Sequence, residues 1–143
     1  MTPPLSVLLS DDNPADRLIY RRFLEQSATE YLVHEANDGA TGLEAAARLQ
    51  PDCILLDLRL SGESGYEVLF ALMKPDRLPR MPVIMLTGAT WNVLETGARS
   101  LGASGYLVKG KIDAPGLDRA IRGAILRALT AQRHEMSHQV EPR

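Results

Sequence analysis

The segment Leu-Ser-Val-Leu-Leu-Ser-Asp-Asp-Asn-Pro, residues 5–14, decides the fold, because an apolar run ends there in two carboxylates and a helix start. Residues 5–9 are nearly continuously apolar, which is typical of a strand buried on both faces of a sheet. Asn13 is a favourable N-cap, and Pro14 suits the first helical position, where an N–H has no partner. The segment therefore predicts a buried strand that runs directly into a helix.

The helix that begins here carries an acidic residue, Asp16, three positions after the N-cap. A carboxylate at this position can reach back to a free backbone amide at the helix start. Three apolar residues are expected to form the buried stripe of the helix: Leu18, Ile19 and Phe23. Three basic residues are expected to remain in water: Arg17, Arg21 and Arg22.

The same succession of apolar run, turn and helical pattern recurs along the chain. Four further runs are predicted to be strands: residues 31–33, 53–56, 83–86 and 106–108. Helical patterns lie between them, at about 39–49, 64–74 and 91–101. Short apolar strands that alternate with helices indicate βαβ units and a parallel sheet covered by helices. The predicted fold class is therefore α/β.

The last predicted helix is the most regular. Its apolar residues recur at helical spacing: Leu117, Ala120, Ile121, Ala124, Ile125, Ala128 and Leu129. Arg119, Arg122 and Arg127 lie off this stripe and are interpreted as a solvated face, with a docking surface for a partner as the alternative. The sequence turns polar after residue 131, so 131–143 is predicted to be a polar extension, solvated or frayed.

Composition excludes several classes of protein. A chain of 143 residues is long enough for one domain with its own core. Its 16 basic and 18 acidic residues give a net charge of -2, without the basic excess of a nucleic-acid binder. The lone Cys53 excludes an internal disulfide and fits a reducing compartment. No apolar run is long enough to span a membrane, and the first residues lack the basic segment of a signal peptide, so we expect a cytoplasmic protein.

Chemically active residues follow four of the predicted strands. Asp11 and Asp12 follow the first, and Asp57, Thr87 and Lys109 come at the ends of the third, fourth and fifth. In a doubly wound sheet, ligands bind at this carboxyl edge. Carboxylates that meet there repel one another unless a cation binds, and oxygen ligands in an open site favour Mg²⁺. A metal with a lysine and a hydroxyl beside it is what a phosphoryl group needs.

In combination, these motifs resemble the receiver domains of bacterial two-component response regulators. The motifs are the pair Asp11-Asp12, the stretch 57–65, Thr87-Gly88-Ala89 and Lys109. The resemblance implies a flavodoxin-like, doubly wound (βα)5 fold with a five-stranded parallel sheet of order 2-1-3-4-5 and helices on both faces. It implies a receiver domain over residues 5–130, after a tail at 1–4.

The resemblance also implies a phosphoacceptor and a cofactor. Asp57 is expected to accept a phosphoryl group from the phosphohistidine of a kinase or of a histidine phosphotransfer protein. Mg²⁺ is the implied cofactor. Asp12 and Asp57 would bind it directly, Asp11 largely through water, and Arg59 through its backbone carbonyl.

A switch is implied by the same resemblance. Lys109 would pair with Asp57 and later with the phosphoryl oxygens, and Thr87 would donate a hydrogen bond to them. Tyr106 would turn inward as Thr87 moves and reshape the face made by the helix near 91–101, the strand near 106–108 and the last helix. A downstream effector protein, or a second copy of the chain in a possible homodimer aided by Trp91, would bind this face. We expect no direct contact with nucleic acid or membrane, and no enzyme activity beyond the chain's own phosphorylation and dephosphorylation.

Two positions depart from the family pattern, and two other functions are alternatives. The family usually has proline where Ser61 and Gly110 stand here. A pseudo-receiver, which binds partners without phosphorylation, would lack a site residue. A flavin-binding protein of this topology would have a phosphate loop where Asp11-Asp12 stands.

The segment His134-Glu135-Met136-Ser137-His138 matches the H-E-x-x-H pattern of zinc proteases. A catalytic zinc needs a third protein ligand in an enclosed cleft. Only five residues follow His138, and the segment is polar on all sides. We therefore interpret it as part of the polar extension, with chance metal binding by the two histidines as the alternative.

Overall fold

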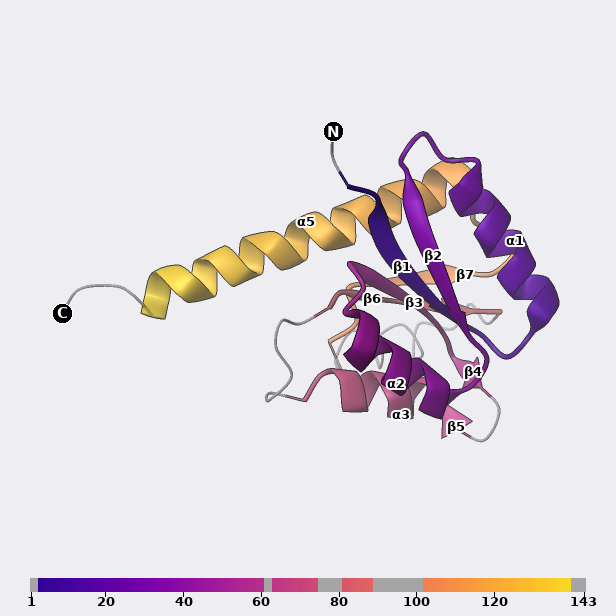
Figure 1. Ribbon diagram of the computed structural model, residues 1–143, viewed down its shortest axis with the longest axis horizontal. Coiled ribbons are helices and arrows are strands. Elements are labelled where there is room, and N and C mark those ends of the chain that lie inside the picture. The colour runs from indigo at the N-terminus through magenta and orange to yellow at the C-terminus, as the bar shows by residue number, and fades with distance from the viewer. Residues whose placement is uncertain (1–2, 61–62, 75–80, 89–101, 140–143) are drawn as a thin grey trace.

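A five-stranded parallel sheet forms the centre of the protein (Figure 1). The computed structural model describes residues 3–60, 63–74, 81–88 and 102–139. The sheet strands are β1 (Leu5–Ser10), β2 (Tyr31–Ala36), β3 (Cys53–Asp57), β6 (Val83–Thr87) and β7 (Gly105–Val108). Their order is β2-β1-β3-β6-β7, and all four pairings are parallel. Counted within the sheet alone, this is the predicted order 2-1-3-4-5, so the predicted fold class is confirmed.

Helices cover both faces of this sheet. They are α1 (Pro14–Glu25), α2 (Gly39–Leu49), α3 (Gly65–Leu72) and α5 (Ala114–Gln139). Figure 1 places α1 and α5 on one side of the sheet and α2 and α3 on the other. The helix predicted near 91–101, with Trp91, lies outside the described residues, as do Ser61 and Ala89.

Strand alternation builds two separate cores. Leu8, Ile54 and Met85 point into the core beneath α2 and α3. Their neighbours Leu9 and Leu55 point the other way, into the core with α1 and α5. Strands buried on both faces must be apolar at every position, which is why β1, β3 and β6 could be recognised as continuous runs.

The predicted buried stripe of α1 is wrong at Leu18 and Ile19 and holds in part at Phe23. Leu18 and Ile19 are each 47% exposed, whereas Tyr20 and Leu24 are buried and Phe23 is partly buried. The helix is rotated relative to the prediction because the Tyr20 ring packs edge-on against Phe23, 5.8 Å between centroids, and so fills the space over the sheet.

The surroundings of the basic residues of α1 also differ from the prediction. Arg17 and Arg21 each form a 3.0 Å ion pair with Glu35 on β2, so they do not simply face water. Arg22 is exposed, as predicted.

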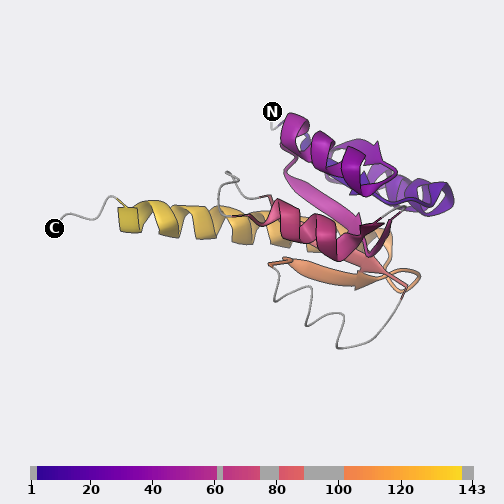
Figure 2. The same ribbon diagram turned by 90° about the horizontal axis from the view of Figure 1, so that it is seen from below.

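Helix α5 contains the predicted stripe, begins at Ala114 and continues through residue 130 to Gln139. Leu117, Ile121 and Ala124 are fully buried, but Leu129 is half exposed. Figure 1 and Figure 2 both show the helix running on past the end of the sheet, which explains this loss of burial. The segment 134–138 is helical in its backbone, and its side chains lie outside the described part of the structure. No helix among the described residues is long and apolar enough to cross a membrane.

Two of the three arginines of α5 that were predicted to form a solvated face have partners. Arg122 pairs with Asp118 one turn earlier at 2.9 Å, and Arg127 donates a hydrogen bond to the Ser104 carbonyl at 3.0 Å. Arg119 is exposed. The prediction of a solvated face therefore holds for Arg119 and for the half-exposed Arg122, while Arg127 also ties the helix to the start of β7.

A short hairpin, β4 (Arg59–Leu60) and β5 (Glu63–Ser64), follows β3 and was not predicted, because two-residue strands carry no periodicity. It leads to Gly65 at the start of α3. A Cβ on Gly65 would lie 2.2 Å from the Asp57 carbonyl oxygen and 2.8 Å from the Leu58 Cα. Only glycine therefore allows α3 to pack this closely on the backbone that carries Asp57.

We expect Gly65→Ala to lower the free energy of unfolding by about 1 to 3 kcal/mol or more, because rigid backbone must move to admit the methyl group. Urea denaturation measures this change. Gly123→Ala on α5 is the matched control. Its added methyl group meets only the flexible end of Arg127 at 3.3 Å and should stabilise the helix by up to about 1 kcal/mol. Equal stability of Gly65→Ala and wild type would contradict the close packing.

Candidate functional site

The register of the strands brings the predicted site residues to one edge of the sheet. Ser10 pairs with Leu56, and Thr87 pairs with Val108, so the residues that follow β1 and β7 emerge at the same level as the end of β3. The Lys109 N–H then donates a 2.7 Å hydrogen bond to the Thr87 carbonyl. The edge position predicted from the sequence therefore follows from the pairing itself.

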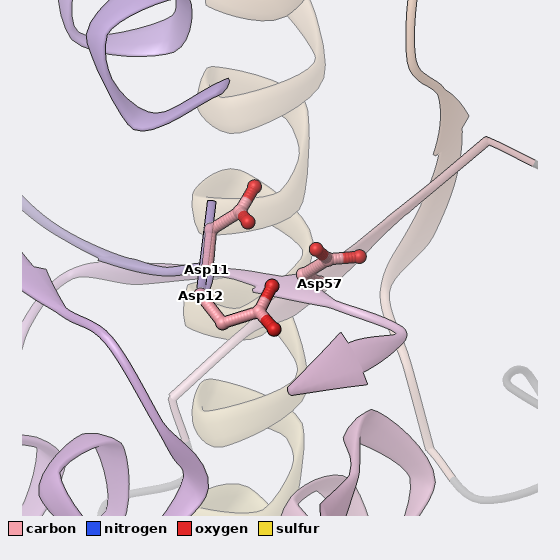
Figure 3. A group of neighbouring side chains, drawn as sticks. All are labelled: Asp11, Asp12 and Asp57. Carbon is pink, nitrogen blue, oxygen red and sulfur yellow. The ribbon is translucent and has the colours of Figure 1, made fainter. Parts of the chain in front are cut away.

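Three carboxylates meet at this edge. Asp11, Asp12 and Asp57 each offer one oxygen, and these oxygens lie within 4.8 Å of one another. Figure 3 shows the three side chains gathered where β1 and β3 end. Asp11 and Asp57 are 0% and 5% exposed, whereas Asp12 is exposed. The group therefore has two buried members and one that faces solvent.

Lys109 is the cationic centre of the site. Its ammonium donates hydrogen bonds to Asp11 Oδ2 at 2.8 Å, Asp16 Oδ2 at 2.7 Å and Asp57 Oδ2 at 2.9 Å. An ammonium has three N–H donors, and three carboxylates are in place to receive them. Burial alone would lower the pKa of Lys109, but the three carboxylates outweigh it and raise the pKa above its usual value. Lys109 is therefore firmly protonated.

Asp57 is held in an unfavourable charge state. The pKa of Asp57 is raised to about 6: burial raises it most, the hydrogen bond from Lys109 opposes this rise, and the neighbouring Asp11 adds to it. The Arg59 N–H donates to the other carboxylate oxygen, Oδ1, at 3.2 Å. One ammonium does not compensate the buried charge of Asp11 and Asp57.

The donor set fits a hard divalent cation. The three grouped side chains supply oxygen ligands only, which Mg²⁺ and Ca²⁺ prefer. The exposed Asp12 leaves a solvent side on which a Mg²⁺ ion could keep water ligands. A cation would also relieve the repulsion that raises the Asp57 pKa. The predicted role of the Arg59 carbonyl as a ligand stays a prediction.

Asp16 lies in the site, although its position after the N-cap predicted a role in capping α1. It was expected to bind a free amide at the start of α1, but the Asn13 N–H is taken by Asp11 Oδ1 at 2.9 Å. Asp16, Tyr20 and Leu24 are spaced i, i+4 and i+8, so they share the face of α1 that packs on the sheet. This spacing was the signal that could have placed Asp16 beside Lys109. Arg17, the next residue, donates to the Asp11 carbonyl oxygen at 2.5 Å.

The two predicted switch residues lie beside this site. Thr87 ends β6 and is buried, 4% exposed. Tyr106 is half-buried on β7 and packs against the core beneath α2 and α3. Gly110, where the family usually has proline, has a φ of 83°, in the left-handed region that proline cannot adopt. The backbone after Lys109 is therefore built for glycine.

We expect Asp57→Asn to stabilise the protein in metal-free buffer at pH 8. The folded pKa of about 6 exceeds the unfolded value of about 3.9, so ionised Asp57 opposes folding above pH 6, and this penalty fades as the pH falls toward 4. Urea denaturation in EDTA should show a gain on the order of 2 kcal/mol at pH 8 that largely disappears at pH 4.5.

Glu25→Gln, at an exposed position at the end of α1, is the control for loss of an acidic charge and should change stability by less than about 0.5 kcal/mol. A variant Asp57→Asn that is less stable than wild type at pH 8 would contradict the charge assignment.

Comparisons with known proteins identify the family of the chain. The family model of the response regulator receiver domain matches residues 7–122. The nitrate/nitrite response regulator protein NarP of Escherichia coli is 36% identical over 106 residues, which cover 74% of this chain and 48% of NarP. The polar-differentiation response regulator DivK of Brucella anthropi is 32% identical over 106 residues, 74% of this chain and 85% of DivK. The chain thus spans about half the length of NarP and most of DivK.

A solved structure has the same fold. The response regulator domain of Thermotoga maritima CheB superposes with a TM-score of 0.75 at 27% identity, over 86% of this chain and 97% of that domain. The family match extends over most of the sequence and includes β1, β3, β6 and β7, whose ends carry the site. The chain belongs to the family of response regulator receiver domains.

Proposed function

We propose that this receiver domain accepts a phosphoryl group on Asp57. The supporting observation is the bonding of this one carboxylate. Asp57 is buried at the end of β3, with Lys109 on one oxygen and the Arg59 N–H on the other, and Asp11 and Asp12 beside it. A carboxylate oriented in this way is a nucleophile suited to in-line attack on phosphorus.

The proposed donor is the phosphohistidine of a histidine kinase or of a histidine phosphotransfer protein. An oxygen of Asp57 attacks the phosphorus, the P–N bond breaks, and its electron pair remains on the imidazole nitrogen. The product is an acyl phosphate on Asp57. Mg²⁺, held by Asp12 and Asp57 directly, by Asp11 largely through water and by the Arg59 carbonyl, would neutralise charge on the phosphoryl oxygens.

The chain's own residues supply the remaining stabilisation. Lys109 can turn its N–H donors from carboxylate to phosphoryl oxygens, because the charge on Asp57 is lost when the acyl phosphate forms. The Thr87 hydroxyl, at the end of the neighbouring strand β6, is a further donor for these oxygens. Both groups act at the carboxyl edge, where a donor protein can approach from solvent.

The proposed output is a change in partner binding. Thr87 would move toward the phosphoryl group, and Tyr106 would follow it inward and change the face that includes β7 and α5. The third part of this face, near 91–101, lies outside the described residues. The proposed binder is an effector protein, with a homodimer as the alternative. We propose action in the cytoplasm, without direct contact to nucleic acid or membrane and without catalysis on other molecules.

We expect one phosphoryl group on wild type after incubation with acetyl phosphate and Mg²⁺, and none on Asp57→Asn, because the variant lacks the proposed nucleophilic carboxylate. Intact mass spectrometry measures the gain. Asp52→Asn, an exposed position just before the opposite end of β3, is the matched control and should be phosphorylated normally. No gain in wild type, or an undiminished gain in Asp57→Asn, would refute the proposal and favour an unphosphorylated binding module.

We expect Mg²⁺ to bind at the three carboxylates and to raise the stability of wild type by about 2.7 kcal/mol at a concentration 100 times its dissociation constant. Asp12→Asn should weaken binding about tenfold or more, since it removes a charged ligand from the solvent side. Isothermal titration calorimetry gives the affinity, and Asp52→Asn should bind as wild type does. Equal affinity in Asp12→Asn would place the metal elsewhere.

A further inference from the structure

The third carboxylate on Lys109 has no part in the proposed metal site. Asp11 and Asp57 belong to the group of oxygens that could hold a cation, but Asp16 does not. Nevertheless, Asp16 makes the shortest of the three contacts to the ammonium, at 2.7 Å. Of the three carboxylates, Asp16 is therefore the one that binds Lys109 without also belonging to the possible cation site.

The position of Asp16 is fixed by the core. It lies in the first turn of α1, whose capping residue Asn13 accepts hydrogen bonds from the amides of Ala15 and Asp16. One and two turns further along the same face, Tyr20 and Leu24 are buried against the sheet. The carboxylate is thus presented to Lys109 by a packed helix rather than by a loop.

We propose that Asp16 is a positioning residue for phosphoryl transfer, which holds the Lys109 ammonium beside Asp57 from the side of α1. This inference rests on the proposed function. The other two carboxylates change their bonding during the reaction, because cation binding engages Asp11 and Asp57, and Asp57 loses its charge when it is phosphorylated. Asp16 keeps both its charge and its contact, so one N–H of Lys109 stays anchored while the other two can turn to the phosphoryl oxygens.

Two effects of Asp16 oppose each other. Its negative charge repels an incoming phosphoryl group, which would slow transfer. Its contact restrains a long side chain with many rotamers and so places the ammonium before the donor arrives, which speeds transfer. Of the three carboxylates on Lys109, Asp16 has the most exposed side chain, at 30% against 0% for Asp11 and 8% for Asp57, so solvent screens its repulsion most strongly. Positioning therefore outweighs repulsion.

The kinetic test compares Asp16→Ala and Asp16→Asn with wild type at saturating Mg²⁺ and with acetyl phosphate as the donor. In the reaction, an oxygen of Asp57 attacks phosphorus and acetate leaves with the electrons of the broken P–O bond. We expect the phosphorylation rate to fall about tenfold in Asp16→Ala. Asp16→Asn keeps an acceptor oxygen without the charge, so it should recover the rate to within about threefold of wild type.

Glu67→Ala is the matched control. Glu67 occupies the same third position after the cap in α3, is exposed, and should leave the rate unchanged when it is lost. Mg²⁺ affinity, measured by calorimetry, should stay within about threefold of wild type in both Asp16 variants, because Asp16 is not a ligand. Thermal denaturation verifies that each variant is folded.

A spectroscopic test needs neither metal nor donor. The sequence has three lysines, and Lys74 and Lys111 are exposed. In protein labelled with ¹⁵N at the lysine ammonium groups, the signal of Lys109 should be protected from solvent exchange in wild type and in Asp16→Asn. It should exchange faster in Asp16→Ala, because one of the three acceptors is gone.

The possible outcomes distinguish the role of Asp16 from the proposed function. A phosphorylated wild type with an unchanged or faster rate in Asp16→Ala overturns the inference and leaves the proposed function intact. A loss of Mg²⁺ affinity that matches the loss of rate overturns it too, since Asp16 would then act through the metal. A wild type that takes up no phosphoryl group refutes the proposed function and, with it, a role for Asp16 in transfer. An unchanged Lys109 signal in Asp16→Ala refutes the anchoring itself.

Discussion

The contact of one lysine ammonium with three carboxylates is the interaction on which the rest of the site depends. Lys109 comes from the end of β7, Asp57 from β3, and Asp11 and Asp16 from the end of β1 and the start of α1, so three parts of the chain that are far apart in sequence meet at a single nitrogen. Asp12 lies beside Asp11 and Asp57, so Lys109 shares this edge of the sheet with four carboxylates. Lys109 keeps these segments together, yet it leaves the site with an excess of negative charge. That excess makes the site receptive to a divalent cation.

The fold creates this excess by aligning strand ends. Parallel strands in register bring the residues after β1, β3, β6 and β7 to one edge, whatever their chemistry. The close approach of Gly65 to the Asp57 backbone then fixes the start of α3 against the same edge. The raised pKa of Asp57 is the electrostatic consequence, because burial and Asp11 oppose its ionisation more than Lys109 favours it. The ionised carboxylate of Asp57, the proposed phosphoacceptor, thus lowers the stability of the metal-free protein.

Much of this arrangement could be predicted from the sequence, and the exceptions have physical causes. The buried strands β1, β3 and β6 were recognisable because both of their faces must be apolar. Strand β2 was predicted only over 31–33, but it extends to Ala36. Among the described strands it pairs with β1 alone, at the edge of the sheet, where polar residues are tolerated. Glu35 on this strand pairs with Arg17 and Arg21. The hairpin β4 and β5 is too short for any pattern.

The error on α1 also hid a site residue. Leu18 and Ile19 are more hydrophobic than Tyr20, so the face that contains them was predicted to be buried, whereas the face with Tyr20 is buried. On the true face, Tyr20 and Leu24 continue a series that begins at Asp16, and this series places an acid next to Lys109. A tyrosine has enough apolar surface to lie in a core. Where the first turn of a helix lies beside a charged site, its inward-facing residue can be polar. The buried face of a helix that starts at a functional edge is therefore better predicted from its second and third turns, where packing alone decides which residues are buried. The same face, extended back to the first turn, then identifies the polar residue that lies beside the site.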